Sequence, residues 1–187
     1  MIHNFFFLLF SFSMLFNAAP LNASAYDNDV LDIFSKLMPR FILMSSSKNG
    51  LQDKIEICVL HDKIDERAAL SLIDKIDSNY PSGIKNYKIK VLNSNYSHID
   101  VCQNSQLTFM FDSGDKNIDK AVKYSNEHTI FTMSYDPKYL EKGVNASLFL
   151  GRKVTPYVNM NALRKSGIEL DNVLIRISKI YLNEDGQ

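Results

Sequence analysis

The 187-residue chain lacks the short motifs that mark most catalytic centres. It contains no H-E-x-x-H, no G-x-S-x-G, no P-loop, no G-x-G-x-x-G and no C-x-x-C. Its four histidines are scattered, whereas a zinc site needs ligands clustered at helical or hairpin spacing. These absences predict no catalytic residues, no metal site and no cofactor. They make an exported enzyme the weakest functional hypothesis, because no nucleophile and base can be named from their spacing.

Net charge is absent too, since 21 Lys and Arg balance 21 Asp and Glu. The charges form no basic stripe, which argues against a nucleic acid partner. Beyond the amino terminus there is no apolar run of 18 or more residues, the length that a membrane-spanning helix requires. The chain that follows is therefore expected to be soluble.

The amino terminus carries the one long apolar run, Phe5–Phe16. It has the length of a signal-peptide h-region and is too short to span ~30 Å of hydrocarbon as a helix. Ala23-Ser24-Ala25 forms an A-x-A cleavage site before Tyr26, although the residues before the run include no Lys or Arg. We expect residues 1–25 to be a signal peptide cleaved after Ala25, leaving one domain over residues 26–187. An uncleaved anchor or a buried helix is the alternative.

Only two cysteines are present, Cys58 and Cys102. An even pair in an exported chain favours a disulfide, because the compartments outside the cytoplasm are oxidising. The alternative is two buried thiols that never meet.

Strand and helix patterns alternate along the domain, which is typical of a mainly parallel sheet covered by helices. A helix begins at Asp29, with Val30, Phe34, Leu37 and Phe41 at helical spacing, and Pro39 should kink or split it. The run from Lys54 to Leu60 is nearly all apolar at its end, as in a strand buried on both faces. Further strands are expected over residues 87–92, 107–111 and 129–133, with helices between them.

The end of the chain changes character. Apolar segments over residues 146–150 and 153–159 flank Gly151-Arg152, a pair suited to a tight hairpin. Asn161 is expected to cap a short helix that stops at Gly167, and Asp171 to cap a last helix. That last helix should place five side chains inward: Val173, Leu174, Ile177, Ile180 and Tyr181. The fold class predicted is α/β, a single domain with a mainly parallel sheet of five to six strands flanked by helices, ending in an antiparallel hairpin and a terminal helix.

Polar residues follow three of the expected strands. Open parallel sheets bind ligands beyond the carboxyl ends of their strands, so these residues could line a small-ligand pocket. An acidic cluster of this kind also occurs in phosphate-accepting receiver domains, but an exported protein meets no cytoplasmic phosphodonor. The alternative is that Asp and Ser merely start loops and cap helices. The candidate pocket residues are His61, Asp62, Asp112, Ser134 and Asp136.

The carboxyl-terminal third resembles the signature of the YfiR-like (YfiR/HmsC) family of bacterial periplasmic proteins. Ile57-Cys58-Val59-Leu60 is similar to that family's Ile-Cys-Val-Leu-Gly strand, with His61 where Gly is usual. Within residues 146–181, the positions that match the family pattern are Val154, Val158, Asn159, Met160, Ala162, Gly167, Ile168, Leu174 and Ile180.

The resemblance implies a periplasmic regulatory protein rather than an enzyme. Characterised family members repress an inner-membrane diguanylate cyclase by binding its sensor domain, which lowers cyclic di-GMP and biofilm formation. The partner implied is the periplasmic domain of such a cyclase or of a sensor kinase, and a homodimer is a further possible assembly. The family often has a Cys in the first strand and another before the third, and these strands are neighbours in a doubly wound order, so Cys58 and Cys102 could approach bonding distance. The alternative function is a periplasmic sensor module that binds a small solute.

Overall fold

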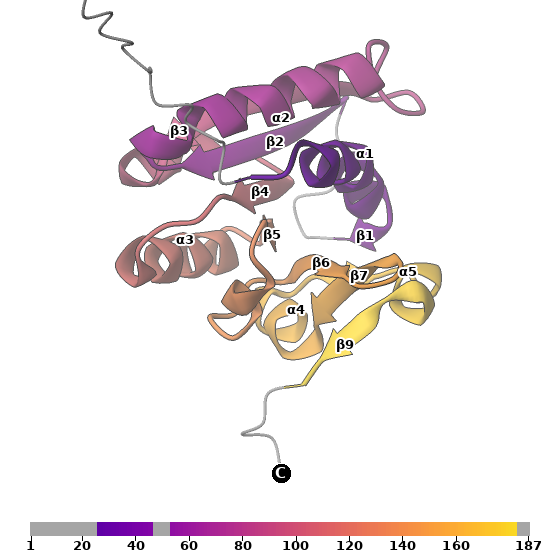
Figure 1. The fold of residues 1–187 in the computed structure, drawn as a ribbon. Helices are drawn as coiled ribbons and strands as arrows, with labels where there is room; N and C mark the ends of the chain where they lie inside the picture. The colour runs from indigo at the N-terminus through magenta and orange to yellow at the C-terminus, as the bar shows by residue number, and fades with distance from the viewer. Residues whose placement is uncertain (1–25, 47–52, 183–187) are drawn as a thin grey trace, which may run out of the picture.

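A seven-stranded, mostly parallel sheet runs through the computed structural model, which describes residues 26–46 and 53–182 (Figure 1). The strand order is β3-β2-β4-β5-β6-β7-β9. Neighbouring strands pair in parallel except β6 and β7, which form an antiparallel hairpin. The bounds are β2 (Lys54–His61), β3 (Lys88–Asn95), β4 (Leu107–Met110), β5 (Phe131–Ser134), β6 (Ala146–Leu150), β7 (Val154–Asn159) and β9 (Lys179–Tyr181).

Five α-helices and three short 3-10 helices lie within the described residues. The α-helices are α1 (Asn28–Leu43), α2 (Glu66–Asn79), α3 (Asp115–Glu127), α4 (Met160–Ser166) and α5 (Asn172–Ile177). The 3-10 helices are η1 (Lys63–Asp65), η2 (Tyr96–Cys102) and η3 (Pro137–Leu140). A second, two-stranded antiparallel sheet joins β1 (Ser45–Ser46) to β8 (Glu169–Leu170).

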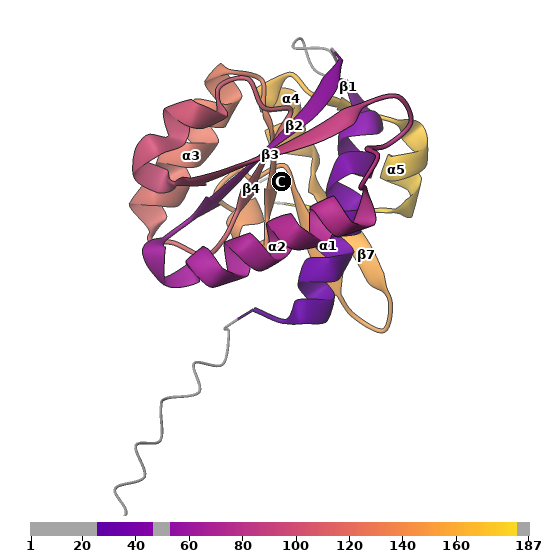
Figure 2. The same ribbon diagram turned by 90° about the horizontal axis from the view of Figure 1, so that it is seen from above.

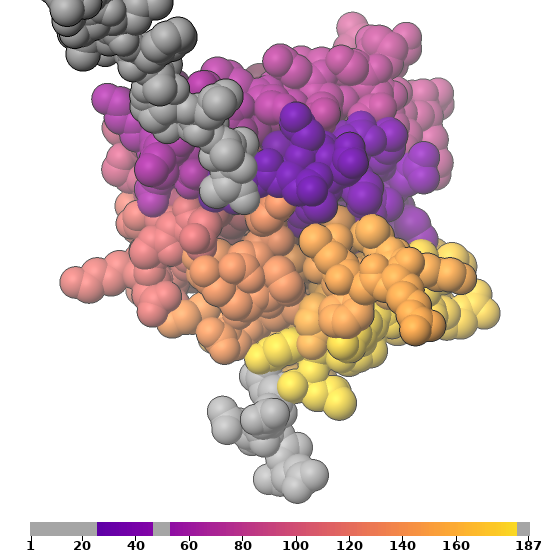
Figure 3. Space-filling view, in the orientation of Figure 1, coloured from indigo at the N-terminus to yellow at the C-terminus, as the bar shows by residue number. Residues whose placement is uncertain are grey.

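Apolar side chains form a core on each face of the large sheet. Alternate residues of the strands point to opposite faces. Thus Ile57 and Val59 pack with α1 and α2, whereas Cys58 and Leu60 pack with α3 and η2. From above, α3 lies on the opposite side of the strands from α1 (Figure 2). In the space-filling view, α1 fills the space between α2 and the β6–β7 hairpin (Figure 3).

Helix α1 continues through Pro39 without a break. Asp27 caps its start, its side chain accepting bonds from the amides of Asp29 and Val30. Pro39 is itself buried, and it lies between Met38 and Phe41, which are buried as well. Packing of this face, which supplies most of a helix's stability in a folded protein, outweighs the lost backbone hydrogen bond. Of the two expected outcomes, a kink or a split, the split is therefore absent.

The predicted fold class is confirmed, but the sheet has seven strands instead of five to six. The added strand is β9, which was expected to continue the last helix. Helix α5 ends at Ile177 because Ser178 adopts an extended backbone, and Ile180 then pairs in register with Val158. Because α5 ends early, fewer of its side chains are buried than expected. Leu174 is buried, but Val173 and Ile177 are about half exposed.

The caps of the two last helices agree in part with expectation. Gly167 ends α4 with a left-handed φ of 68°, and Asp171 caps α5 by accepting a bond from the amide of Val173. The cap of α4 was misplaced, because Asn159 and not Asn161 accepts from the helix amide. Asn161 instead accepts a bond from the Arg164 guanidinium.

Candidate functional site

Two of the strand-end residues predicted from the sequence hold neighbouring loops together at the carboxyl edge of the sheet. Asp62 follows β2 and accepts a hydrogen bond from the Ser113 hydroxyl, beyond β4, at 2.7 Å. Asp112 precedes that serine and accepts a hydrogen bond from the Tyr139 hydroxyl of η3. The loops after three strands are therefore tied together by side chains.

Lys138 joins Asp112 to the third strand end. Its ammonium lies 3.0 Å from a carboxylate oxygen of Asp112 and 3.1 Å from one of Asp136. Burial alone would raise the pKa of Asp112, but the hydrogen bonds from Tyr139 and Lys138 outweigh it and hold this pKa below its usual value. The bonds to Asp112 and Asp136 likewise raise the pKa of Lys138. Asp112 and Lys138 are thus both charged at neutral pH.

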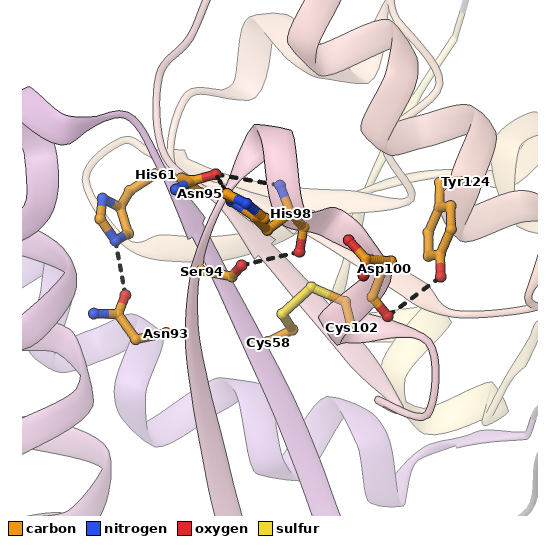
Figure 4. Close-up of a disulfide and its surroundings, with 9 residues drawn as sticks. All are labelled: Cys58, His61, Asn93, Ser94, Asn95, His98, Asp100, Cys102 and Tyr124. Atoms are coloured by element: carbon orange, nitrogen blue, oxygen red, sulfur yellow. Dashed lines mark hydrogen bonds between the residues drawn. A yellow bond between two sulfur atoms is a disulfide. The ribbon is translucent and has the colours of Figure 1, made fainter.

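The other two candidates make different contacts. One ring nitrogen of His61 is 2.8 Å from the carbonyl of Asp62, and the other is 2.8 Å from the Asn93 side chain on β3 (Figure 4). Ser134 is fully buried and donates to the backbone carbonyl of Asp136 at 2.8 Å. Both side chains are therefore occupied by bonds within the protein.

Tyr26 is the residue at this edge that sequence reasoning missed. Only 8% of it is exposed, and its ring makes edge contacts with Phe111 and Tyr135, each at 4.7 Å between ring centroids. Its hydroxyl accepts a bond from the amide of Asp112 and is hydrogen-bonded to the Asp65 carboxylate. No pattern marks it, because it precedes the first helix and belongs to no strand.

These residues surround the topological switch point of the sheet. The connection after β2 leads to β3 on one side, and the connection after the neighbouring strand β4 leads to β5 on the other, so the crossovers diverge between β2 and β4. Open α/β sheets bind ligands at this position. We call four residues that contact Tyr26 the switch-point site: Asp65, Phe111, Asp112 and Tyr135.

A disulfide joins Cys58 to Cys102 on the α3 face of the sheet (Figure 4). Cys58 lies in β2, Cys102 ends η2, and their Cα atoms are 5.5 Å apart. The Ser94 hydroxyl donates to the carbonyl of His98, and the Tyr124 hydroxyl to that of Asp100. Covalent and polar contacts together hold η2 against β2, β3 and α3.

The family-signature residues have structural roles. Asn159 is buried, accepts a bond from the amide of Ala162, and donates to the carbonyl of Leu140 at 2.8 Å. Ala162 and Leu174 are buried, and Gly167 supplies the left-handed stop of α4. These four residues therefore contribute to how the C-terminal elements pack.

Apolar side chains are exposed around the hairpin and α5. Leu150 and Val154 face each other across the hairpin near its turn, and Val173 and Ile177 lie one turn apart on α5, which packs beside β7. The Lys179 ammonium lies 3.7 Å from the centroid of the Phe149 ring. We call the five residues the C-terminal apolar group: Phe149, Leu150, Val154, Val173 and Ile177, each 39–56% exposed.

The described part of the chain holds no cluster of three His, Cys, Asp or Glu side chains that could bind a metal ion. Nor does any helix in residues 26–46 and 53–182 have the length and hydropathy to cross a membrane. The structure is thus an α/β domain with a disulfide. The polar side chains at the carboxyl edge of its sheet are hydrogen-bonded or ion-paired within the protein, and apolar side chains are exposed near its carboxyl terminus.

A comparison with known protein families identifies the family of this chain. The chain belongs to the YfiR/HmsC-like family, whose model matches residues 38–179. The sequence resemblance is thereby confirmed. Membership is consistent with a periplasmic regulatory protein.

Solved structures support the fold alone. The chain is similar to a conserved domain protein from Vibrio cholerae O1 biovar El Tor, with a TM-score of 0.61, 10% identity and coverage of 80% of this chain and 59% of that one. It is also similar to an ABC domain in complex with L-Trp from Streptococcus pneumonia, with a TM-score of 0.57, 7% identity and coverage of 81% and 60%. It thus spans about three fifths of each of these chains. A search of curated proteins gave no match.

Proposed function

We propose that this protein is a periplasmic repressor that binds the sensor domain of an inner-membrane diguanylate cyclase, or of a similar membrane sensor, and thereby lowers cyclic di-GMP. The proposal includes export by the signal peptide, which lies outside the described residues, and a mature domain that begins at Tyr26. Family membership supports a regulator with a membrane partner. A bound repressor would act by its higher affinity for one conformation of the sensor.

The observation that carries the proposal is the C-terminal apolar group. Exposed apolar side chains that lie close together commonly mark protein interaction sites, and Leu150 and Val154 pair directly across the hairpin. The strand-end carboxylates, in contrast, already have hydrogen-bond partners within the chain. The surface around the hairpin and α5 is therefore the better candidate for contact with a partner.

Crosslinking in the intact envelope followed by pull-down tests the partner. We expect recovery of a membrane protein with a cyclase or kinase domain, and a rise in cyclic di-GMP when the gene is deleted. Unchanged cyclic di-GMP together with no membrane protein recovered would contradict the proposal.

Matched variants test the surface. Ile177→Ser should abolish repression without lowering expression, because Ile177 is 56% exposed on α5. Ile64→Ser is the control, since Ile64 is 89% exposed but lies on η1. Equal repression by both variants would exclude α5 from the interface.

A second candidate function is a solute-binding sensor, favoured by the polar residues beside the switch point. A thermal-shift screen with small metabolites tests it. If Asp112→Ala leaves every stabilising metabolite unaffected, the strand-end residues are not its binding site.

A further inference from the structure

Tyr26 is bound at the switch point much as a ligand would be. Tyr26 precedes α1 and lies outside the strand–helix units that build the sheet. Its ring lies against those of Phe111 and Tyr135. Those two residues directly follow β4 and β5. The rings of Phe111 and Tyr135 at the carboxyl edge of the sheet thus form an apolar surface on which the Tyr26 ring packs.

The hydroxyl end of Tyr26 is recognised from two sides. The Asp112 amide donates to it at 3.1 Å, and the Asp65 carboxylate accepts from it. Burial raises the pKa of Tyr26, so its hydroxyl stays protonated and able to donate at neutral pH. A phenylalanine ring would fill the same space but leave both polar partners without a bond.

Tyr26 belongs to the main apolar core, and its polar end has two defined partners as well. Ligand sites in proteins are mostly apolar with a few polar groups that fix orientation, and in open α/β sheets they occur at the switch point. We propose that the switch-point site is a binding site for phenolic molecules, and that Tyr26 occupies it as a tethered ligand.

Occupancy of the site is coupled to the first helix. Asp27 follows Tyr26 directly, caps α1, and donates its amide to the Tyr135 hydroxyl at 3.0 Å. A free phenol that replaces Tyr26 would release the start of the chain from Phe111 and loosen this cap. A small molecule could therefore change the position of the mature amino terminus.

The test uses the mature protein with Tyr26→Ala and two probes of almost equal size. 4-Methylphenol is the tyrosine side chain as a free molecule, and toluene differs from it chiefly in lacking the hydroxyl. We expect 4-methylphenol to raise the melting temperature of the Tyr26→Ala protein and to bind about tenfold more tightly than toluene, because only the phenol can hydrogen-bond to the Asp112 amide and the Asp65 carboxylate. Wild-type protein should respond less, since Tyr26 fills the site.

Tyr80→Ala is the matched control. Tyr80 donates its hydroxyl to the backbone carbonyl of Lys36, midway along α1 and away from the switch-point site. This variant should show no gain with 4-methylphenol over wild type. Equal affinity of Tyr26→Ala for both probes, or an equal response of wild type, would overturn the proposal, because either result shows apolar filling or binding elsewhere.

Tyr26→Phe keeps the test decisive should Tyr26→Ala not fold. The phenylalanine ring still packs against Phe111 and Tyr135, but the Asp112 amide loses the hydroxyl that accepts its hydrogen bond. We expect hydrogen exchange at that amide to quicken at least tenfold by NMR, and unchanged exchange would overturn the recognition of the hydroxyl. Both experiments use purified protein, so their outcome is independent of any membrane partner.

Discussion

In the parallel part of the sheet, from α1 to β5, the phenylalanine rings are buried, whereas in the C-terminal part, from β6 to β9, Phe149 and several aliphatic side chains reach solvent. Phe34, Phe109 and Phe131 are at most 1% exposed, but Phe149 is 39% exposed. The parallel part uses its apolar surface for stability. The C-terminal part leaves some of its apolar side chains exposed, which supports the proposed contact with a partner.

Truncating a ring in each part should show the largest difference. Phe34→Ala should cost about 3–5 kcal/mol of unfolding free energy, because a fully buried ring is replaced by a cavity. Phe149→Ala should cost about 1 kcal/mol or less, as expected for a partly exposed side chain. Urea denaturation measures both values. Similar costs would show that the hairpin is as tightly packed as the parallel core.

The disulfide belongs to the parallel part only, so its removal should weaken that part. The double variant Cys58→Ala and Cys102→Ala should lose about 2–4 kcal/mol, because the bond closes a loop with a sequence separation of 44. Alkylation and mass measurement without reductant verify the bond in the parent protein. Two alkylated thiols in that sample, or a double variant of parental stability, would contradict the prediction.

Asp65 and Asp112 lie at the carboxyl edge of the parallel strands. Their ionisation should change the stability of the protein in opposite directions as pH rises. Burial and the charges of Asp62 and Asp112 raise the pKa of Asp65, although the Tyr26 hydrogen bond lowers it. Ionised Asp65 therefore reduces stability as pH rises through its folded pKa. We expect Asp65→Asn to be more stable than the parent at pH 7, with the gain vanishing below the unfolded pKa of ~3.9.

Asp112 has a lowered pKa, because hydrogen bonds outweigh its burial. Its contribution is present above the unfolded pKa and is lost as pH falls through the folded pKa. Asp112→Asn should thus reduce stability at pH 7 and approach the parent in acid. Its side chain is 54% exposed, so solvent screening keeps the effect small. Thermal unfolding between pH 2 and pH 8, a range of about six units that brackets both titrations, distinguishes the two variants.

The smallest change in stability is expected for an exposed side chain of α5, a helix that has both exposed and buried apolar side chains. Ile177→Ala should change the unfolding free energy by about 0.5 kcal/mol or less, since Ile177 is 56% exposed. Leu174→Ala should cost about 2–5 kcal/mol, because Leu174 is buried. Denaturant melts of the two single variants compare them directly. A large cost for Ile177→Ala would mean that this side chain serves the core instead of a partner.

Local patterns were sufficient to predict the parallel part. The apolar run ending at Leu60 predicted a buried central strand, and β2 indeed lies between β3 and β4. The residues after Ile177 were wrongly assigned to the last helix, because Ile180 and Tyr181 suit a helix face and a strand equally well. Pairing with β7, a long-range contact, decided between them.

The site was predictable only in outline. Asp62, Asp112 and Asp136 follow strands, so their common edge could be inferred from the sequence. Their partners could not, because contacts such as that between Tyr139 and Asp112 depend on how a later loop folds back. Tyr26 was missed for the same reason.

The bond between Cys58 and Cys102 also affects what happens when the backbone is cut. Helix α2, strand β3 and most of η2 lie between the two cysteines, and so does the exposed turn at Lys85, which has a left-handed φ of 54°. A trypsin-like protease that cleaves after Lys85 would leave two polypeptides joined by one covalent link. The nicked protein would migrate as an intact chain on a non-reducing gel and separate into two fragments only after reduction.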